Sequence, residues 1–185
     1  MIYAIAIAVL FLLLIIGLYN TLIRKKNDVE NAFASVDVML KKRYDLIPNL
    51  VETVKSYMKH EKGLLTELTK LRAQAVSGEL PPNQRVELEN KITKGISGVM
   101  VAVENYPDLK TSQNFLQLQA AWNEAEEQIS ASRRAFNAAV TAYNNKVEIF
   151  PSNIMAGIMG YKRRTLFEIP EAERQNLNAG NLFNN

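Results

Sequence analysis

The side chains that could carry chemistry are few, and their spacing forms no familiar catalytic motif. The chain has one histidine, His60, and no cysteine, so thiolate metal sites and cysteine nucleophiles are excluded. Glu124, Glu126 and Glu127 could in principle bind a divalent cation, but no Glu-x-x-His pair supports a di-metal bundle. Nucleophile-elbow and phosphate-loop motifs are absent. We therefore expect no enzyme, metal or cofactor; a hydrolase acting through these carboxylates is the disfavoured alternative.

Two basic runs could be read as contacts to phosphate groups. The first is Lys41, Lys42 and Arg43, and the second ends at Arg164. The formal net charge is only +3, and basic residues are interspersed with acidic ones along the chain. We therefore expect no nucleic-acid partner.

The second basic run follows a short apolar stretch, and this combination has two interpretations. The residues concerned are Ile154, Met155, Ile158, Met159, Lys162, Arg163 and Arg164. They could lie on an anionic membrane surface, with the apolar side chains in contact with lipid. The favoured interpretation is a short helix that caps the bundle, because the apolar stretch is short for independent membrane binding.

The N-terminal segment predicts a membrane anchor over residues 1–23, which contain no Asp, Glu, Lys, Arg or His. At about 1.5 Å per residue a helix of this length covers the roughly 30 Å hydrocarbon core. Twelve Ile, Leu, Val and Phe residues between Ile2 and Leu18 favour insertion by an amount on the order of 5 kcal/mol. Cleavage as a signal peptide is disfavoured, since a basic start and a small-x-small site are missing. The expected anchor residues are Ile2, Leu10, Phe11, Leu14, Ile16, Leu18 and, at the interface, Tyr19.

The orientation of the anchor is predicted from Arg24, Lys25 and Lys26, which follow it directly. No Lys or Arg precedes it. Under the positive-inside rule, this places the N-terminus outside and the C-terminal domain in the cytoplasm.

The rest of the chain shows helical periodicity. We therefore predict an all-α fold, in which a transmembrane helix is followed by a long-helix antiparallel bundle of three to four helices. The apolar stripes of these helices are expected to pack as in a coiled coil. Apolar residues recur at helical spacing from Val29 to Leu71, then in a helix starting near Gln84, then in one capped by Thr111 or Ser112. Ser152 is expected to cap a short helix that reaches Met159. The domains are therefore the anchor 1–23, a bundle 24–160 and a polar, flexible tail 161–185.

Pro48 interrupts the first stripe, and the sequence leaves two outcomes open. The helix continues with a kink, or it breaks and Asp45 caps a new helix. In the kinked case the carbonyl of Tyr44 lacks its helical donor and could receive a partner, or be satisfied within the domain. The candidate partner surface is Arg43, Tyr44, Asp45, Pro48 and Asn49.

Several stretches, taken together, resemble the LemA family. They include Lys42–Val51 (Lys-Arg-Tyr-Asp-Leu-Ile-Pro-Asn-Leu-Val), Glu104–Lys110, Arg133–Asn137 and Phe150–Asn153. Phe136 stands where the family often has tyrosine. The resemblance implies a bacterial membrane protein with a long-helix bundle and without established enzymatic activity. It also implies a link of some relatives to membrane remodelling in magnetosome-forming bacteria, and supplies no catalytic residues.

Two hypotheses of function follow for a chain anchored in the bacterial inner membrane. The first is a non-enzymatic scaffold or interaction protein, whose partners are the lipid bilayer, other membrane or cytoplasmic proteins, and further copies of itself. The second is an oligomerising, membrane-shaping protein that binds lipid directly.

Overall fold

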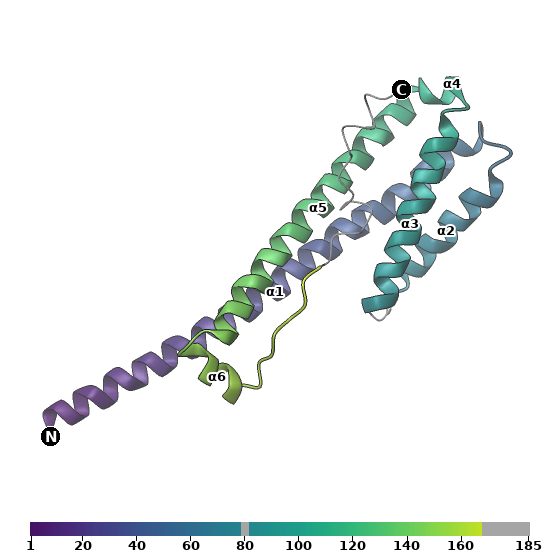
Figure 1. Cartoon of the computed structure of the whole chain (residues 1–185). Helices are drawn as coiled ribbons and strands as arrows, with labels where there is room; N and C mark the ends of the chain where they lie inside the picture. Colours follow the sequence, from purple (N-terminus) through teal and green to yellow (C-terminus); the bar gives the residue numbers. More distant parts are fainter. Residues whose placement is uncertain (79–81, 168–185) are drawn as a thin grey trace, which may run out of the picture. The chain divides into compact units, whose positions relative to one another are not determined.

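The computed structural model describes residues 1–78 and 82–167, and these contain helices and no strand. Figure 1 shows the helices in chain order: α1 (Ile2–Lys55), α2 (Lys62–Val76), α3 (Pro82–Val103), α4 (Pro107–Lys110), α5 (Gln113–Glu148) and α6 (Ser152–Ile158). Four of them are long, and two are short connecting helices. The predicted all-α class with an apolar N-terminal helix and three to four bundle helices is confirmed.

The chain divides into two compact units. Within the described residues, the first comprises residues 1–33 and 133–167, and the second comprises Ala34–Ser132. Helices α1 and α5 each contribute to both units. The anchor residues and the segment around α6 therefore belong to the first unit, and the Lys42–Val51 stretch belongs to the second.

Helix α1 passes through Pro48 without interruption, so of the two outcomes left open by the sequence the continuous helix applies, and the break with a cap at Asp45 does not occur. The proline leaves its ring on the exposed side of the helix, while Ile47 and Leu50 beside it are fully buried. Burial of each such side chain is worth about 1.5–3 kcal/mol, which offsets the roughly 3 kcal/mol cost of an interior proline.

The helix ends at Lys55, although the apolar periodicity from Val29 to Leu71 predicted one continuous helix over this region. Residues 56–61 form a turn that contains neither Gly nor Pro. Met58 is fully buried in it, and the Glu61 carboxylate accepts a hydrogen bond of 2.8 Å from the Tyr106 hydroxyl. The bond to Glu61 comes from a residue 45 positions away, and tertiary contacts of this kind override local helix propensity without appearing in local patterning.

In the second unit, the predicted stripes form the core. Helices α2 and α3 approach closely where α3 has glycines: a Cβ at Gly95 or Gly98 would lie 3.4 Å from a methyl group of Leu68 or Leu64, respectively. The buried core side chains of this unit are Val36, Leu40, Tyr44, Ile47, Leu50, Val54, Met58, Leu65, Leu68, Leu71, Leu88, Ile92, Ile96, Val99, Val103, Leu109, Phe115, Leu118, Trp122, Ala125 and Ile129. Gly95 and Gly98 therefore allow the close approach of α3 to α2.

In the first unit, α1 packs against the C-terminal part of α5. Leu22 and Val29 are buried from α1, and Val140 and Tyr143 from α5. Phe33, Phe136 and Phe167 form an aromatic cluster, with ring centroids of Phe136 and Phe167 4.7 Å apart. Phe136, which stands where the resembled family often has tyrosine, is thus an apolar packing residue.

The N-terminal ends of α5 and α6 show whether the two predicted caps form. Ser112 caps α5, because its hydroxyl accepts a hydrogen bond from the Phe115 amide at 3.3 Å. Ser152 does not cap α6: Pro151 occupies the cap position, and the Ser152 hydroxyl donates to the carbonyl of Ile149. The short helix itself was placed correctly to within one residue at its end.

The segment 161–167 differs from the predicted flexible tail. Asn144 on α5 donates to the carbonyl of Arg164 and accepts from its amide, both at 2.9 Å. Asn137 makes the same pair of bonds with Phe167, at 3.0 and 2.8 Å. These buried or half-buried amides hold the segment along α5, a contact that its polar composition does not suggest; the rest of the predicted tail, 168–185, lies outside the described residues.

Candidate functional site

The anchor end of α1 presents its apolar side chains outward. Mean hydropathy over an 18-residue window reaches 2.8, and none of that window is buried within the protein. Among the predicted anchor residues, Leu18 is half-buried and the others, Ile2, Leu10, Phe11, Leu14, Ile16 and Tyr19, are exposed. Such an apolar, unburied helix supports a membrane anchor. Packing within the protein begins at its end, since Leu22 is fully buried.

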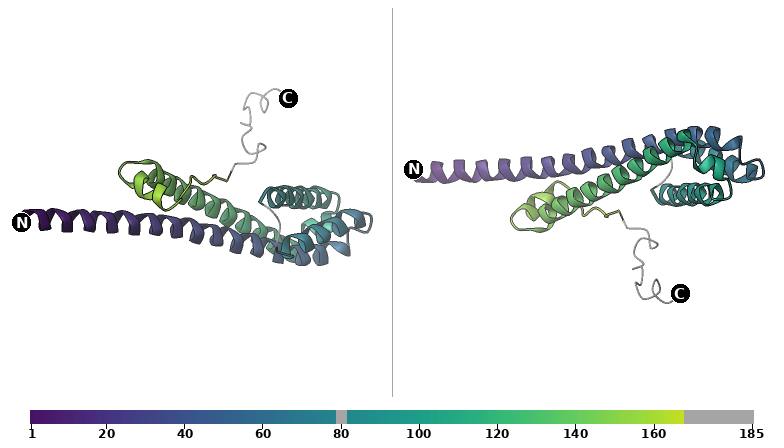
Figure 2. Two further views of the ribbon diagram at one scale, coloured as in Figure 1. Left: turned by 90° about the horizontal axis from the view of Figure 1, so that it is seen from below. Right: turned by 90° about the horizontal axis from the view of Figure 1, so that it is seen from above.

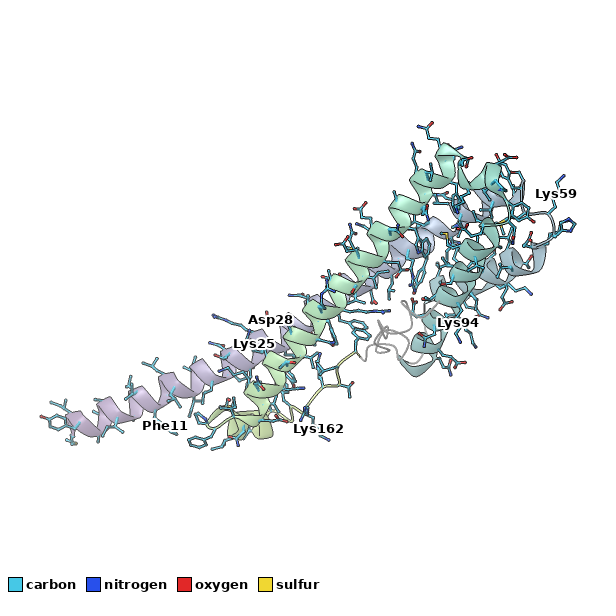
Figure 3. All side chains as sticks on the ribbon, turned by 45° about the horizontal axis from the view of Figure 1, so that its top comes forward. Phe11, Lys25, Asp28, Lys59, Lys94 and Lys162 are labelled. Atoms are coloured by element: carbon cyan, nitrogen blue, oxygen red, sulfur yellow. The ribbon has the colours of Figure 1, made fainter. Side chains whose placement is uncertain are left out.

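The three basic residues after the anchor differ in their surroundings. Lys25 pairs with Asp28 at 2.8 Å and Lys26 with Glu30 at 3.5 Å, while Arg24 is exposed. Figure 3 labels Lys25 and Asp28 on α1. Acidic residues contribute little to topology, so these pairs leave the charge signal for orientation unchanged.

The candidate partner surface in Lys42–Val51 divides into a buried and an exposed part. Arg43 and Tyr44 are 2% and 5% exposed, so the structure contradicts their assignment to an accessible surface. Asp45, Pro48 and Asn49 are exposed on the same stretch. Only these three can meet a partner from this set.

Arg43 lies at the centre of a buried polar cluster that joins three helices. Its guanidinium forms ion pairs with Glu89 on α3 and with Glu126 on α5, the latter at 3.0 Å. The Tyr44 hydroxyl donates to the other oxygen of Glu89. The Nε atom of Arg43 has no hydrogen-bond partner among the described residues. A buried guanidinium is tolerated only when it is paired, and the pairs made by Arg43 link α1 to α3 and to α5 in the second unit.

Glu89 is a residue that the sequence reasoning missed, although a signal was present. Arg43 lies three residues after Leu40 and four before Ile47, on the apolar stripe of its helix, and Glu89 lies three before Ile92 on the next. A charge on the buried face of each of two neighbouring helices predicts a buried pair. The sequence therefore allowed the two partners, Arg43 and Glu89, to be proposed, but not the distances and hydrogen bonds between them.

Arg72 on α2 satisfies the carbonyl that Pro48 leaves free. Its Nε donates to the Tyr44 carbonyl at 3.0 Å, and its guanidinium lies 3.7 Å from the Asp45 carboxylate. The free acceptor proposed from the sequence is therefore occupied within the domain, which was the alternative left open.

A shallow hollow of about 360 Å³ lies beside this stretch. It is lined by Asp37, Lys41, Tyr44, Asp45, Ala75, Val76, Gly78, Leu88 and Glu89. Charges of both signs and the apolar side chains of Val76 and Leu88 share its wall, and Val76 is 52% exposed. The hollow is open and mixed in character, which suits a protein segment better than a small ligand.

The C-terminal candidate segment has an inner and an outer side. On α6, Ser152 and Ala156 are buried, Met155 and Met159 are half-buried, and Ile154 and Ile158 are 58% and 77% exposed. In the residues that follow, Lys162 and Arg163 are exposed, and Arg163 pairs with Glu148 at 3.1 Å. Arg164 is half-buried: it pairs with Glu30 at 3.4 Å and lies over the Tyr143 ring, 5.4 Å from its centroid. Helix α6 thus covers the end of the first unit and also presents apolar side chains outward.

Two tyrosines have shifted pKa values. Burial raises the pKa of Tyr143, and the positive charges of Arg164 and Lys26 oppose that rise. The hydrogen bond to Glu61 raises the pKa of Tyr106, with smaller contributions from desolvation and from the Glu61 charge. Both pKa values are raised from the ordinary value of 10.0, so both tyrosines stay protonated near neutral pH and neither serves as a base there.

The residues considered for chemistry are dispersed or engaged in other contacts. His60 is exposed in the turn after α1, Glu124 accepts from Gln128, and Glu126 pairs with Arg43. Within residues 1–78 and 82–167, no group of three or more His, Cys, Asp or Glu side chains is arranged to hold a metal ion. The structure brings together no acid, base and nucleophile from this set.

Comparison with known proteins gives a consistent assignment. The chain is 26% identical to Protein LemA of Metamycoplasma hominis over 95% of this chain and 84% of that protein. It is 22% identical to Magnetosome protein MamQ 2 of Paramagnetospirillum magneticum, over 91% of this chain and 71% of the relative. Magnetosome protein MamQ of Magnetospirillum gryphiswaldense is also 22% identical, over 86% and 68%. The sequence model of the LemA family matches residues 32–179, most of the chain, and the protein therefore belongs to the LemA family.

Proposed function

We propose that this protein is a non-enzymatic, membrane-anchored interaction protein of the bacterial inner membrane. The observation that carries the proposal is the continuity of α1, which runs from the exposed apolar anchor to Lys55 and supplies core residues to both units. Because the same helix enters the membrane and builds the folded units, the protein is suited to hold a helical surface at the membrane. Its partners are membrane or cytoplasmic proteins or further copies of itself.

The surface that best suits a protein partner is the exposed part of the Lys42–Val51 stretch with the hollow beside it. Asp45 lines the hollow, and Asn49 lies one helical turn further along α1. Arg43 and Tyr44 support this surface from the inside by fixing α1 against Glu89. A rigid surface loses little conformational entropy on binding, which favours recognition.

The experiment is site-specific photocrosslinking of the full-length protein in intact cells. A photoreactive residue at Asn49 should give a discrete crosslinked product, whereas one at Glu67, exposed on α2 of the same unit, should not. The product is then identified as a membrane protein, a cytoplasmic protein or a second copy. Equal crosslinking at both positions, or none at Asn49, would contradict this surface.

The orientation is proposed from Arg24, Lys25 and Lys26 and needs its own test. With the N-terminus outside, a C-terminal tag should resist protease in intact spheroplasts and be cleaved only after lysis. Cleavage before lysis would place the folded units outside the cytoplasm and replace cytoplasmic partners with envelope partners.

Membrane shaping by an oligomer is a second candidate. It is supported by the magnetosome proteins among the relatives and by the exposed apolar side chains of Ile154 and Ile158. Reconstitution of the full-length protein into giant vesicles tests it: tubules or buds that increase with protein density would support shaping, and smooth vesicles at high density would exclude it.

A further inference from the structure

The first unit carries a group of exposed apolar side chains at the corner between α5 and α6. Ile149, Phe150, Ile154 and Ile158 are 56%, 75%, 58% and 77% exposed. We call these four residues the α6 corner. Large apolar side chains gathered on one part of a surface mark a site of contact with another molecule or with a membrane.

The corner is held in a defined shape, so its apolar side chains are not a loose end. The Asn153 amide donates to the Ile149 carbonyl and the Tyr161 amide to the Ala156 carbonyl, both at 2.9 Å. Ala156 is 1% exposed and fixes the inner side of α6. The outward positions of Phe150 and Ile158 are therefore a property of the fold.

The register between α1 and α5 places this corner along the anchor helix. The ring centroids of Phe33 and Phe136 lie 5.9 Å apart. Burial raises the pKa of Tyr143, and the positive charge of Lys26 opposes that rise. From the first pair to the second, the advance along α5 equals the step back along α1, as in an antiparallel helix pair. Antiparallel helices rise equally per residue, which puts Glu148 opposite Thr21. The corner therefore lies where the apolar run of α1 ends.

The figures agree with this register for the first unit. In Figures 1 and 2, α6 lies at the end of α5 beside α1, and the purple N-terminal part of α1 continues beyond it. By the register given above, Tyr19, which is 47% exposed, lies opposite Phe150 and suits the interfacial region of a bilayer.

Positive charges accompany the apolar side chains. Lys162 and Arg163 follow α6 and are exposed, Arg163 in an ion pair of 3.1 Å with the exposed Glu148, and Arg24 is exposed on α1 at the end of the anchor. Lys162 is labelled in Figure 3 on the segment after α6. A surface with apolar side chains beside cations matches the boundary between acyl chains and anionic headgroups.

We propose that the α6 corner is seated in the headgroup boundary of the same bilayer that holds α1, with Phe150 and Ile158 in contact with acyl chains and Lys162 and Arg163 at anionic headgroups. The inference rests on the proposed membrane anchoring and adds a second lipid contact to it. The corner and the anchor would together fix the first unit against the membrane surface.

The absence of cysteine from the chain allows a direct depth measurement on the full-length protein. Phe150→Cys and Ile158→Cys are labelled with an environment-sensitive fluorophore and reconstituted into vesicles of phosphatidylcholine with anionic phosphatidylglycerol. Leu10→Cys in the anchor is the lipid-embedded control. Leu116→Cys, 50% exposed on α5 in the other unit, is the matched surface control. Quenching is measured with lipids that carry a nitroxide at a shallow or a deep acyl position.

We expect labels at positions 150 and 158 to be quenched at least twofold more than the label at 116, and more by the shallow than by the deep nitroxide. Quenching at 150 and 158 no stronger than at 116, with Leu10 still quenched, would overturn the lipid seat and leave the anchor intact. Loss of quenching at Leu10 as well would overturn the anchoring itself. A blue-shifted but unquenched label at 150 would indicate a protein contact, such as a second copy, and would also overturn the proposal.

Discussion

The buried pair of Arg43 and Glu89 gives the sharpest test of the second unit. Glu89→Ala removes one of two carboxylates from a guanidinium that is 2% exposed, and it removes the acceptor of the Tyr44 hydroxyl bond. Breaking a buried ion pair costs about 3–5 kcal/mol, because a charge is left without compensation. Glu126 still pairs with one nitrogen of Arg43 at 3.0 Å, so the free energy of unfolding should fall by about 3 kcal/mol.

Glu126→Ala is the matched control, since it removes the other carboxylate from the same arginine. The Glu126 side chain is 40% exposed, so water screens its charge and the cost should be about 1 kcal/mol or less. The double variant Arg43→Met with Glu89→Leu removes both charges and should recover most of the loss of the single Glu89 variant.

The assay is urea unfolding of the full-length protein in a non-ionic detergent, followed by far-UV circular dichroism and tryptophan fluorescence. Trp122 is the only tryptophan and is 6% exposed in the same unit, so its emission reports on this core. With a slope of about 2 kcal/mol per molar urea, a loss of about 3 kcal/mol lowers the midpoint by roughly 1.5 M. A shift for Glu89→Ala no larger than that for Glu126→Ala would refute the buried pair.

Three further outcomes are expected from single changes. Gly95→Leu should destabilise the second unit by about 1–3 kcal/mol in the same urea assay, because its side chain must displace Leu68, only 3.4 Å from the Cβ position; an unchanged midpoint would contradict the close approach of α2 and α3. Asn144→Ala should cost about 1–3 kcal/mol and expose the following segment to limited proteolysis, since two hydrogen bonds to the backbone of residue 164 are lost. The pKa of Tyr106 is raised in the native state, so the folded protein keeps this phenol protonated at a pH where the unfolded chain has released the proton. The resulting contribution to stability is present below about pH 10 and is lost as pH rises through the native pKa of Tyr106. Ultraviolet titration of the wild type against Tyr106→Phe checks this, and an ordinary pKa assigned to Tyr106 would contradict it.

The helices and most of the core could be predicted from the sequence because their signals are local. The apolar stripes and the Ser112 cap each depend on residues within a few positions of one another. The anchor is local in the same sense, because length and composition alone decide it. What periodicity did not supply is the turn after Lys55, which depends on the Tyr106 contact to Glu61 from 45 residues away.

The candidate site was harder to predict because exposure depends on long-range pairing. A basic residue in a run of three, such as Arg43, is normally solvated, so the sequence placed it on the surface. The structure buries it because Glu89 and Glu126 arrive from two other helices. Similarly, the polar composition of residues 161–167 suggested a free tail, whereas Asn137 and Asn144 fasten it to α5 through its backbone, which no composition reveals.

At Pro48, local sequence signals and long-range pairing both decide the structure. Local chemistry correctly identified that the Tyr44 carbonyl loses its helical donor, since proline has no N–H group. Local chemistry also identified the competing possibilities, a partner or an internal donor, but it could not choose between them. The choice is made by Arg72, 28 residues away, whose Nε bonds this carbonyl while its guanidinium approaches Asp45. The acceptor that Pro48 leaves on α1 is therefore used by Arg72 of α2, and a binding partner at this stretch must use Asp45, Asn49 and the neighbouring hollow instead of this backbone group.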